Sequence, residues 1–179
     1  DIGGGEWHFA YDGGHRLTRM RDAYQSTQAV PAETVNVYDS AGRVKKKTFA
    51  DGTTVTFAYD ARGNLDYAVD PHGTTDLEYD ANDRLKKITY PGSRWLQFGY
   101  DTNGRRTSSL DQLGHRLDYF YDSAGRLWYM KNEAAETIVL YEYDTAGRMK
   151  KKSLGNGVYT TYEYDAAGRL KEVEDDSDN

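Results

Sequence analysis

The dipeptide Tyr-Asp occurs eight times along the 179-residue chain, and its spacing limits the folds open to this sequence. Successive tyrosines are 27, 21, 20, 21, 21, 22 and 21 residues apart. An internal period of about 20–50 residues is typical of repeat arrays, in which each unit is stabilised by stacking on its neighbours. We therefore expect one continuous array rather than a globular domain with a single thick core.

Alignment of the copies gives the motif Tyr-Asp-x-x-Gly-Arg-Leu, which is intact at Tyr121–Leu127 and Tyr164–Leu170. His15 and Asp83 replace the glycine, Asn64 replaces the arginine, and Arg106 replaces the final aliphatic residue. We predict a structural role for the repeated tyrosine, aspartate and arginine. These residues are Tyr11, Asp12, Arg16, Tyr38, Asp39, Arg43, Tyr59, Asp60, Tyr79, Asp80, Arg84, Tyr100, Asp101, Arg105, Tyr121, Asp122, Arg126, Tyr143, Asp144, Arg148, Tyr164, Asp165 and Arg169.

The motif has the chemistry of a tight turn. Aspartate can accept hydrogen bonds from nearby backbone amides as an Asx-turn, and glycine supplies a residue in the left-handed region. The arginine then has an acceptor within reach, either the aspartate or a carbonyl, and such a contact would join neighbouring turns. A second glycine precedes most of the tyrosines by about seven residues, so each repeat should contain two turns. These second glycines are Gly52, Gly73, Gly92, Gly114 and Gly157.

Between the turns the residues alternate with a period of two. Val55, Phe57 and Tyr59 would share one face of a strand, and the residue two before the tyrosine is apolar or aromatic in seven of eight copies. We expect this tyrosine face to be the buried one. Two strands of about six residues with short turns consume about 20 residues, so the sequence predicts an all-β fold of consecutive antiparallel β-hairpin repeats.

The array should cover residues 6–173, with a flexible N-terminal segment at 1–5 and a frayed acidic tail at 174–179. The longest spacing contains an enlarged loop between Gln25 and Thr34. The repeat register is the same on both sides of this loop, which favours one domain over two.

Composition excludes several classes of function. The net charge of −6 argues against a nucleic-acid partner, and the chain has no cysteine and no apolar run long enough to insert into a membrane. The four histidines lack the spacing of a zinc motif. Acidic residues recur at every turn, whereas a glycosidase needs one distinctive pair of carboxylates. We therefore predict a non-enzymatic protein with no catalytic residue, no metal site and no cofactor.

Two features leave a binding function open. Trp7, Trp95 and Trp128 could stack on sugars or could belong to the core, and Trp128, beside Tyr129, is the best candidate for an aromatic residue out of the repeat period. Lysine runs follow the arginine turn at 45–47, 86–87 and 150–152. Solvated strand ends explain these lysines, with an anionic glycan or protein surface as the alternative.

The motif and its spacing resemble the YD repeat of RHS-repeat proteins over residues 6 to about 173. The resemblance implies a curved sheet that spirals into a hollow shell, as in bacterial Rhs proteins and the C component of insecticidal Tc toxins. Such a shell encloses a C-terminal toxin, so the implied partners are further YD repeats and an encapsulated effector of the parent chain. It also implies a secreted or cell-surface location, with eight repeats forming only an arc of the wall.

The resemblance leaves an alternative function. Teneurin-like animal proteins use similar shells as extracellular adhesion scaffolds, for which a glycan or a cell-surface protein would be the partner. Family shells also end in an autoprotease segment, and Asp70–Gly73 has a related Asp-Pro-x-Gly sequence. Because this sequence falls in register with the other turn glycines and more repeats follow it, we expect a structural turn there.

Overall fold

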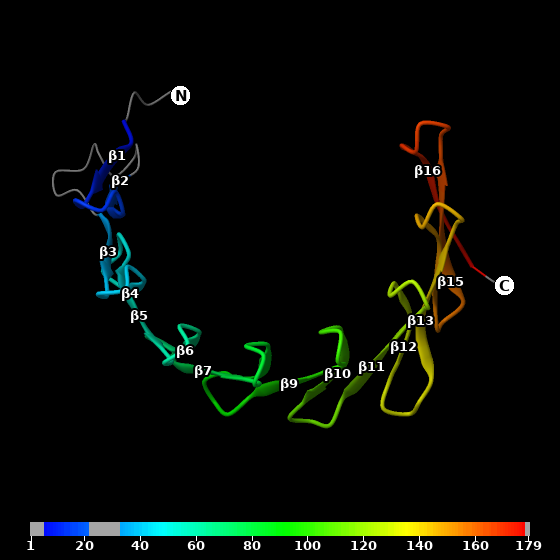
Figure 1. Cartoon of the computed structure of the whole chain (residues 1–179), viewed down its shortest axis with the longest axis horizontal. Coiled ribbons are helices and arrows are strands. Elements are labelled where there is room, and N and C mark those ends of the chain that lie inside the picture. Colours follow the sequence, from blue (N-terminus) through cyan, green and yellow to red (C-terminus); the bar gives the residue numbers. More distant parts are fainter. Residues whose placement is uncertain (1–5, 22–32, 178–179) are drawn as a thin grey trace. The chain divides into compact units, whose positions relative to one another are not determined.

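The computed structural model describes residues 6–21 and 33–177, and this part of the chain is entirely strands and turns (Figure 1). The described residues fall into two compact units, one within residues 1–94 and one within residues 95–179. The strands of the first unit are β1 (His8–Tyr11), β2 (Leu17–Arg21), β3 (Thr34–Tyr38), β4 (Val44–Thr48), β5 (Thr54–Tyr59), β6 (Leu65–Asp70), β7 (Gly73–Tyr79) and β8 (Leu85–Thr89). Those of the second are β9 (Trp95–Tyr100), β10 (Arg106–Asp111), β11 (Arg116–Tyr121), β12 (Leu127–Lys131), β13 (Thr137–Tyr143), β14 (Met149–Leu154), β15 (Val158–Tyr164) and β16 (Leu170–Ser177).

Within each unit, every strand pairs antiparallel with the next strand along the chain, from β1 to β8 and from β9 to β16. The predicted all-β array of consecutive hairpins is therefore confirmed. No described segment forms a helix of the length and apolarity needed to cross a membrane.

Each Tyr-Asp turn closes a hairpin with a β-bulge at the tyrosine. In the β11–β12 hairpin, Phe120 pairs with Tyr129 but Tyr121 pairs with Leu127, so the register shifts by one residue. The loop between Asp122 and Arg126 has Gly125 in the left-handed region, at a φ of 79°. A three-residue loop of this kind combines a type I turn with a bulge and fixes the register of the two strands.

The left-handed backbone recurs even where the glycine is replaced. His15 and Asp83 both have a φ of 60°, close to the 81° of Gly42 in an unaltered motif. The second turns use the same region of conformational space, with a φ of 85° at Gly52 and 90° at Gly114. Outside the undescribed segment 22–32, the two turns per repeat expected from the sequence are therefore present. Turn geometry prevails over side-chain preference at the two replaced positions.

The expectation of a buried tyrosine face needs correction. Among the described residues, none is buried to the degree usual in a protein core, and Tyr38, Tyr59, Tyr121, Tyr143 and Tyr164 are half-buried. A strand that pairs only with its chain neighbours receives cover from side chains on its own face and not from an opposing layer. The apolar residues between the turns therefore form a half-covered surface.

The chain termini differ in part from the prediction. The acidic residues expected to fray continue β16 as far as Ser177, which pairs with Val158 of β15. The predicted flexible segment 1–5 and residues 178–179 lie outside the described residues, as does most of the predicted loop between Gln25 and Thr34.

Candidate functional site

The aspartate of the motif organises its turn through both carboxylate oxygens. Asp122 Oδ1 accepts hydrogen bonds from the backbone amides of Ala124, at 3.0 Å, and Arg126, at 2.8 Å. Its Oδ2 accepts a bond of 2.7 Å from the Arg126 Nε and lies 2.7 Å from Nη2. Because two nitrogens of the guanidinium contact the same oxygen, its orientation is fixed more firmly than by a single contact.

These hydrogen bonds favour the charged carboxylate. The backbone amide of Arg126, followed by its guanidinium, holds the pKa of Asp122 below its ordinary value, and Arg148 acts in the same way on the pKa of Asp144. A carboxyl group whose pKa is lower in the folded state stabilises the fold above its unfolded pKa. That stabilisation is lost as the pH falls through the folded value.

The arginine also reaches the following repeat. The Arg126 guanidinium lies 4.4 Å from the centroid of the Tyr143 ring, and the Tyr143 hydroxyl donates a 2.7 Å hydrogen bond to the carbonyl of Leu127. Four further arginine–tyrosine pairs have ring distances of 4.2–4.8 Å: Arg16 with Tyr38, Arg43 with Tyr59, Arg105 with Tyr121, and Arg148 with Tyr164. We call this repeated set of aspartate, arginine and following tyrosine the ladder.

The ladder revises one prediction from the sequence. The arginine–aspartate contact was expected to join neighbouring turns, but every such motif pair joins residues four apart in one turn. The link between described repeats comes instead from the guanidinium lying over the next tyrosine and from the tyrosine hydroxyl, which donates to the preceding repeat. Sequence reasoning missed this contact because it joins residues about 17 positions apart.

The glycine of the motif also makes room for the arginine. A Cβ atom at Gly42 would lie 3.0 Å from Nη1 of Arg16, and one at Gly147 would lie 3.4 Å from Nη1 of Arg126. A side chain at this position would therefore press on the guanidinium of the preceding repeat. The left-handed backbone therefore favours glycine, and so does the close approach of the arginine.

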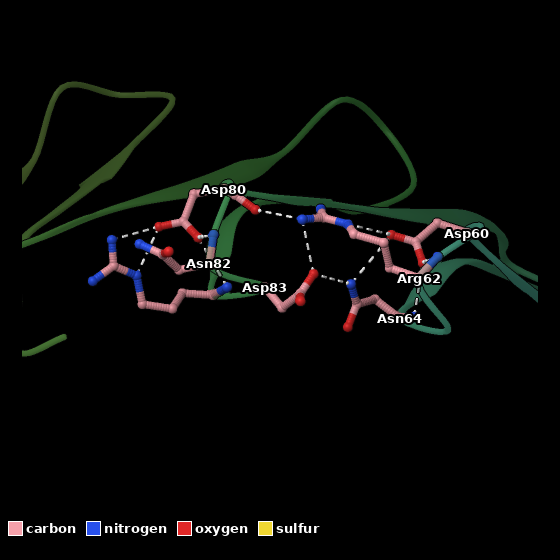
Figure 2. A network of polar contacts seen from close by, with 7 residues as sticks. Asp60, Arg62, Asn64, Asp80, Asn82 and Asp83 are labelled. Carbon is pink, nitrogen blue, oxygen red and sulfur yellow. Dashed lines mark hydrogen bonds and ion pairs between the residues drawn. The ribbon is translucent and has the colours of Figure 1, made fainter.

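The third repeat has a different link, shown in Figure 2. Asn64 occupies the arginine position and donates bonds of 3.2 Å to Asp60 and 2.7 Å to Asp83 of the next turn. Arg62 supplies the cation, with its Nη1 at 2.9 Å from Asp83 Oδ1 and 3.2 Å from the Asp80 carbonyl. Asp83 itself stands where the motif has glycine, so two departures that look independent in the sequence form one contact.

The limited space beside the motif glycine explains why these two departures from the motif occur together. Asn64 is shorter than arginine, so it leaves room at the next turn for the side chain of Asp83, which bonds back to it. Burial, together with the negative charges of Asp60 and Asp66, raises the pKa of Tyr79.

We expect Asn64→Arg and Asp83→Gly to be strongly coupled. Asn64→Arg alone should destabilise unit one because the new guanidinium meets Asp83, whereas the double variant should recover the ladder contact with Tyr79. Urea unfolding of the four members of the cycle should give a favourable coupling of about 1 kcal/mol. Additive effects would show that the two departures are independent.

Some second turns reproduce the motif with other residues. His115 donates its backbone amide to Asp111 Oδ1 at 3.0 Å, and its Nδ1 lies 2.9 Å from Asp111 Oδ2. Asn132 and Glu136 make the equivalent contacts, with 2.9 Å from the Glu136 amide to Asn132 Oδ1 and 2.8 Å from Asn132 Nδ2 to Glu136 Oε2. The sequence signal for these turns is a polar pair four residues apart. The search for glycines found the first turn through Gly114 but missed the second, where Ala135 takes the left-handed conformation.

The Asp111–His115 pair makes one turn sensitive to pH. The hydrogen bond and charge of Asp111, together with the charge of Glu133, raise the pKa of His115 above its ordinary value of 6.5. The stabilisation is present below pH 6.5 and is lost as the pH rises through the folded pKa. We expect His115→Arg to remove this loss, because arginine stays charged.

Thermal unfolding between pH 5.5 and 8.5 tests this expectation. The melting temperature of the wild-type chain should fall over the upper part of this pH range, whereas that of His115→Arg should fall less. His72→Arg serves as the control, because the His72 side chain is 88% exposed and its Nδ1 lies 3.7 Å from Asp70 Oδ1, beyond hydrogen-bond range. Parallel pH profiles for the wild type and His115→Arg would contradict the assignment.

The tryptophans occupy different environments. Trp128 is 48% exposed and contacts Tyr129 edge-on, with 4.9 Å between the ring centroids. Tyr129 stacks on Phe120, its partner across the strands, at 4.4 Å. These two rings lie on the sheet face opposite Tyr119, because side chains alternate along a strand. Trp95 lies at the start of β9, half-buried, and donates its backbone amide to Gln112.

The other candidate features lie in ordinary strand and turn positions. Asp70 accepts hydrogen bonds from the amides of His72 and Gly73, which makes Asp70–Gly73 a turn between β6 and β7. Lys47 lies over Phe49 and Lys151 over Tyr159, at 4.8 and 3.7 Å. Within the described residues no cluster of histidine, aspartate or glutamate could hold a metal ion.

Comparison with known families identifies the class of this array. The family model described as "RHS Repeat" matches residues 38–66 and 143–178. These two segments therefore match RHS repeats, also called YD repeats, and the ladder is the contact set of the repeated motif. A comparison with curated proteins found no match.

Solved structures share the fold. A crystal structure of TcdB2-TccC3-TEV matches 96% of this chain with a TM-score of 0.63 and 17% identity. A Tc holotoxin pore from Photorhabdus luminescens, carrying a substitution in TccC3, also matches 96% of it, with a TM-score of 0.55 and 17% identity. The chain spans only 11% and 12% of these two chains. The particular likeness is therefore to a small part of the Tc toxin TcdB2 and TccC3 assemblies.

Proposed function

We propose that this array is a non-enzymatic wall segment of a hollow shell that encloses a C-terminal toxin or effector. The carrying observation is that the repeated aspartates and arginines bond to one another and to neighbouring tyrosines. Polar groups engaged in this way build a sheet and are not free for bond chemistry. The likeness in fold to TcdB2-TccC3 structures supports the same function.

The absence of a buried core among the described residues agrees with this role. A strip of hairpins that lacks a second layer exposes both faces, so it can separate two compartments. Its stability comes from contacts between consecutive repeats, and such a wall can extend by adding repeats. The partners in this proposal are further YD repeats and the enclosed effector, in a secreted or surface-delivered parent protein.

An adhesion scaffold is the second candidate. The observation that favours it is the aromatic group formed by exposed Phe120 and Trp128 with half-buried Tyr129, because exposed aromatic rings can stack on a sugar or pack against a partner protein. In that case the array would bind a glycan or a cell-surface protein and would enclose nothing.

Limited proteolysis of the full parent protein separates the two candidates. If the array encloses an effector, the segment C-terminal to the repeats should resist protease, and the pair Arg126→Ala with Tyr143→Ala should make its cleavage at least tenfold faster. Lys150→Ala is the control, because Lys150 is exposed. An effector cleaved equally fast with and without the array would overturn enclosure, and a parent with a membrane anchor in place of an effector would favour adhesion.

A further inference from the structure

The β11–β12 hairpin carries an aromatic cluster, Phe120, Trp128 and Tyr129, at positions that the other repeats fill mostly with polar or small residues. Phe120 pairs with Tyr129 in the register that joins Glu142 to Lys151 in the following hairpin. Trp128 follows the motif arginine by two positions, where the other seven copies have polar residues. These residues are Thr18, Lys45, Asp66, Lys86, Thr107, Lys150 and Lys171. The cluster is therefore a departure from the repeat pattern that the ladder does not explain.

The aromatic cluster is exposed although its hairpin lies inside the second unit. β10 pairs with β11 and β13 pairs with β12, so neighbouring strands cover both edges of the hairpin. Trp128 is nevertheless 48% exposed and Phe120 is 37% exposed. Tyr129 contacts both rings, stacked on Phe120 and edge-on to Trp128. The exposure of the cluster therefore belongs to the face of the sheet and not to a strand edge.

Charged side chains adjoin the aromatic cluster. Asp118 pairs with Lys131 across the two strands, and each lies two residues from a ring of the pair Phe120 and Tyr129, on the same face of the sheet. The Arg116 guanidinium donates to Asp118 from Nε at 2.9 Å and from Nη2 at 2.7 Å. The Lys131 ammonium lies 5.9 Å from the Tyr129 ring centroid, and no carboxylate of the described residues forms an ion pair with it. Because the Arg116–Asp118 pair is neutral, Lys131 leaves one unbalanced positive charge beside the rings.

This combination of groups fits a carbohydrate that bears a carboxylate. The C–H groups of a sugar ring pack on the electron-rich face of an aromatic ring. A carboxylate and a guanidinium together offer acceptors and donors to sugar hydroxyl groups, and an ammonium attracts the carboxylate of an acidic sugar. A protein partner would typically cover about 800 Å² with an apolar centre. Three partly exposed rings bordered by charged residues are too few to form such a centre.

We propose that the β11–β12 hairpin binds an acidic glycan, one that contains a hexuronate. A sugar ring stacks on Trp128, the sugar hydroxyl groups bond to Asp118 and Arg116, and the sugar carboxylate pairs with Lys131. The inference deepens the second candidate function and rests on it for the binding role of the aromatic cluster. Enclosure of an effector is measured by protease protection, so glycan binding and enclosure can each fail without the other.

Isothermal titration calorimetry with matched ligands tests the proposal. The ligands are linear tetramers of galacturonate and of glucuronate, each with its methyl ester, which keeps the sugar ring but removes the charge. At least one of the acids should bind the wild-type chain, about tenfold more tightly than its ester. Trp128→Thr, which introduces the residue found at the equivalent positions 18 and 107, should weaken that binding at least tenfold. Lys131→Gln should bind the acid and its ester equally.

Two variants at equivalent positions serve as controls. Tyr67 is an exposed ring in the register position of Tyr129, but it pairs with Ala58 and not with a second ring. Lys150 takes the place of Trp128 in the next repeat and is exposed. Tyr67→Ser and Lys150→Gln should therefore bind the acid like the wild type. Circular dichroism should show the same β-sheet signal for all four variants, because each substitution lies outside the ladder.

Several outcomes would overturn the proposal. They are a wild-type chain that binds neither acid, an ester that binds as tightly as its acid, and Trp128→Thr that binds like the wild type. Self-association of the wild-type chain that Trp128→Thr abolishes would also overturn it, because a second copy of the chain would then occupy the aromatic cluster.

Discussion

The structure depends on a repeated arginine that contacts two partners, illustrated by Arg126 with Asp122 and Tyr143. The aspartate of the same turn fixes the guanidinium through paired hydrogen bonds, and the tyrosine of the next repeat covers it. The side chain thus belongs to a local turn and to a contact between repeats at once. Because the aspartate orients the guanidinium before the next hairpin packs on it, less conformational entropy is lost when the repeats join.

This contact replaces much of what a hydrophobic core does elsewhere. The tyrosines that lie over an arginine are half-buried, and within the described residues no second layer covers the strands of either unit, so apolar burial alone contributes less per residue than in a globular domain. The tyrosine therefore makes two contacts: its ring packs against the guanidinium, and its hydroxyl donates a hydrogen bond to a carbonyl of the preceding repeat. A fold made in this way can lengthen repeat by repeat without a growing core.

Much of the fold could be predicted from the sequence, because turns and strands follow local rules. The Tyr-Asp spacing, the turn glycines and the alternation around Phe57 gave the hairpins and their order. The covering of Arg126 by Tyr143 could not be predicted in this way, since bulges rotate side chains out of simple alternation and the partners lie in different repeats. For the same reason the link between the departures at Asn64 and Asp83 could not be predicted, because their side chains contact each other only in the folded sheet.

A double-mutant cycle between Arg126 and Tyr143 tests the central claim most directly. Arg126→Ala and Tyr143→Leu, alone and together, should give a coupling of about 1 kcal/mol in urea unfolding, because leucine keeps apolar bulk but removes the ring face. The same cycle between Arg126 and Tyr164, which covers a different arginine, should give additive effects. Equal coupling in both cycles, or none in the first, would contradict the ladder as the link between repeats.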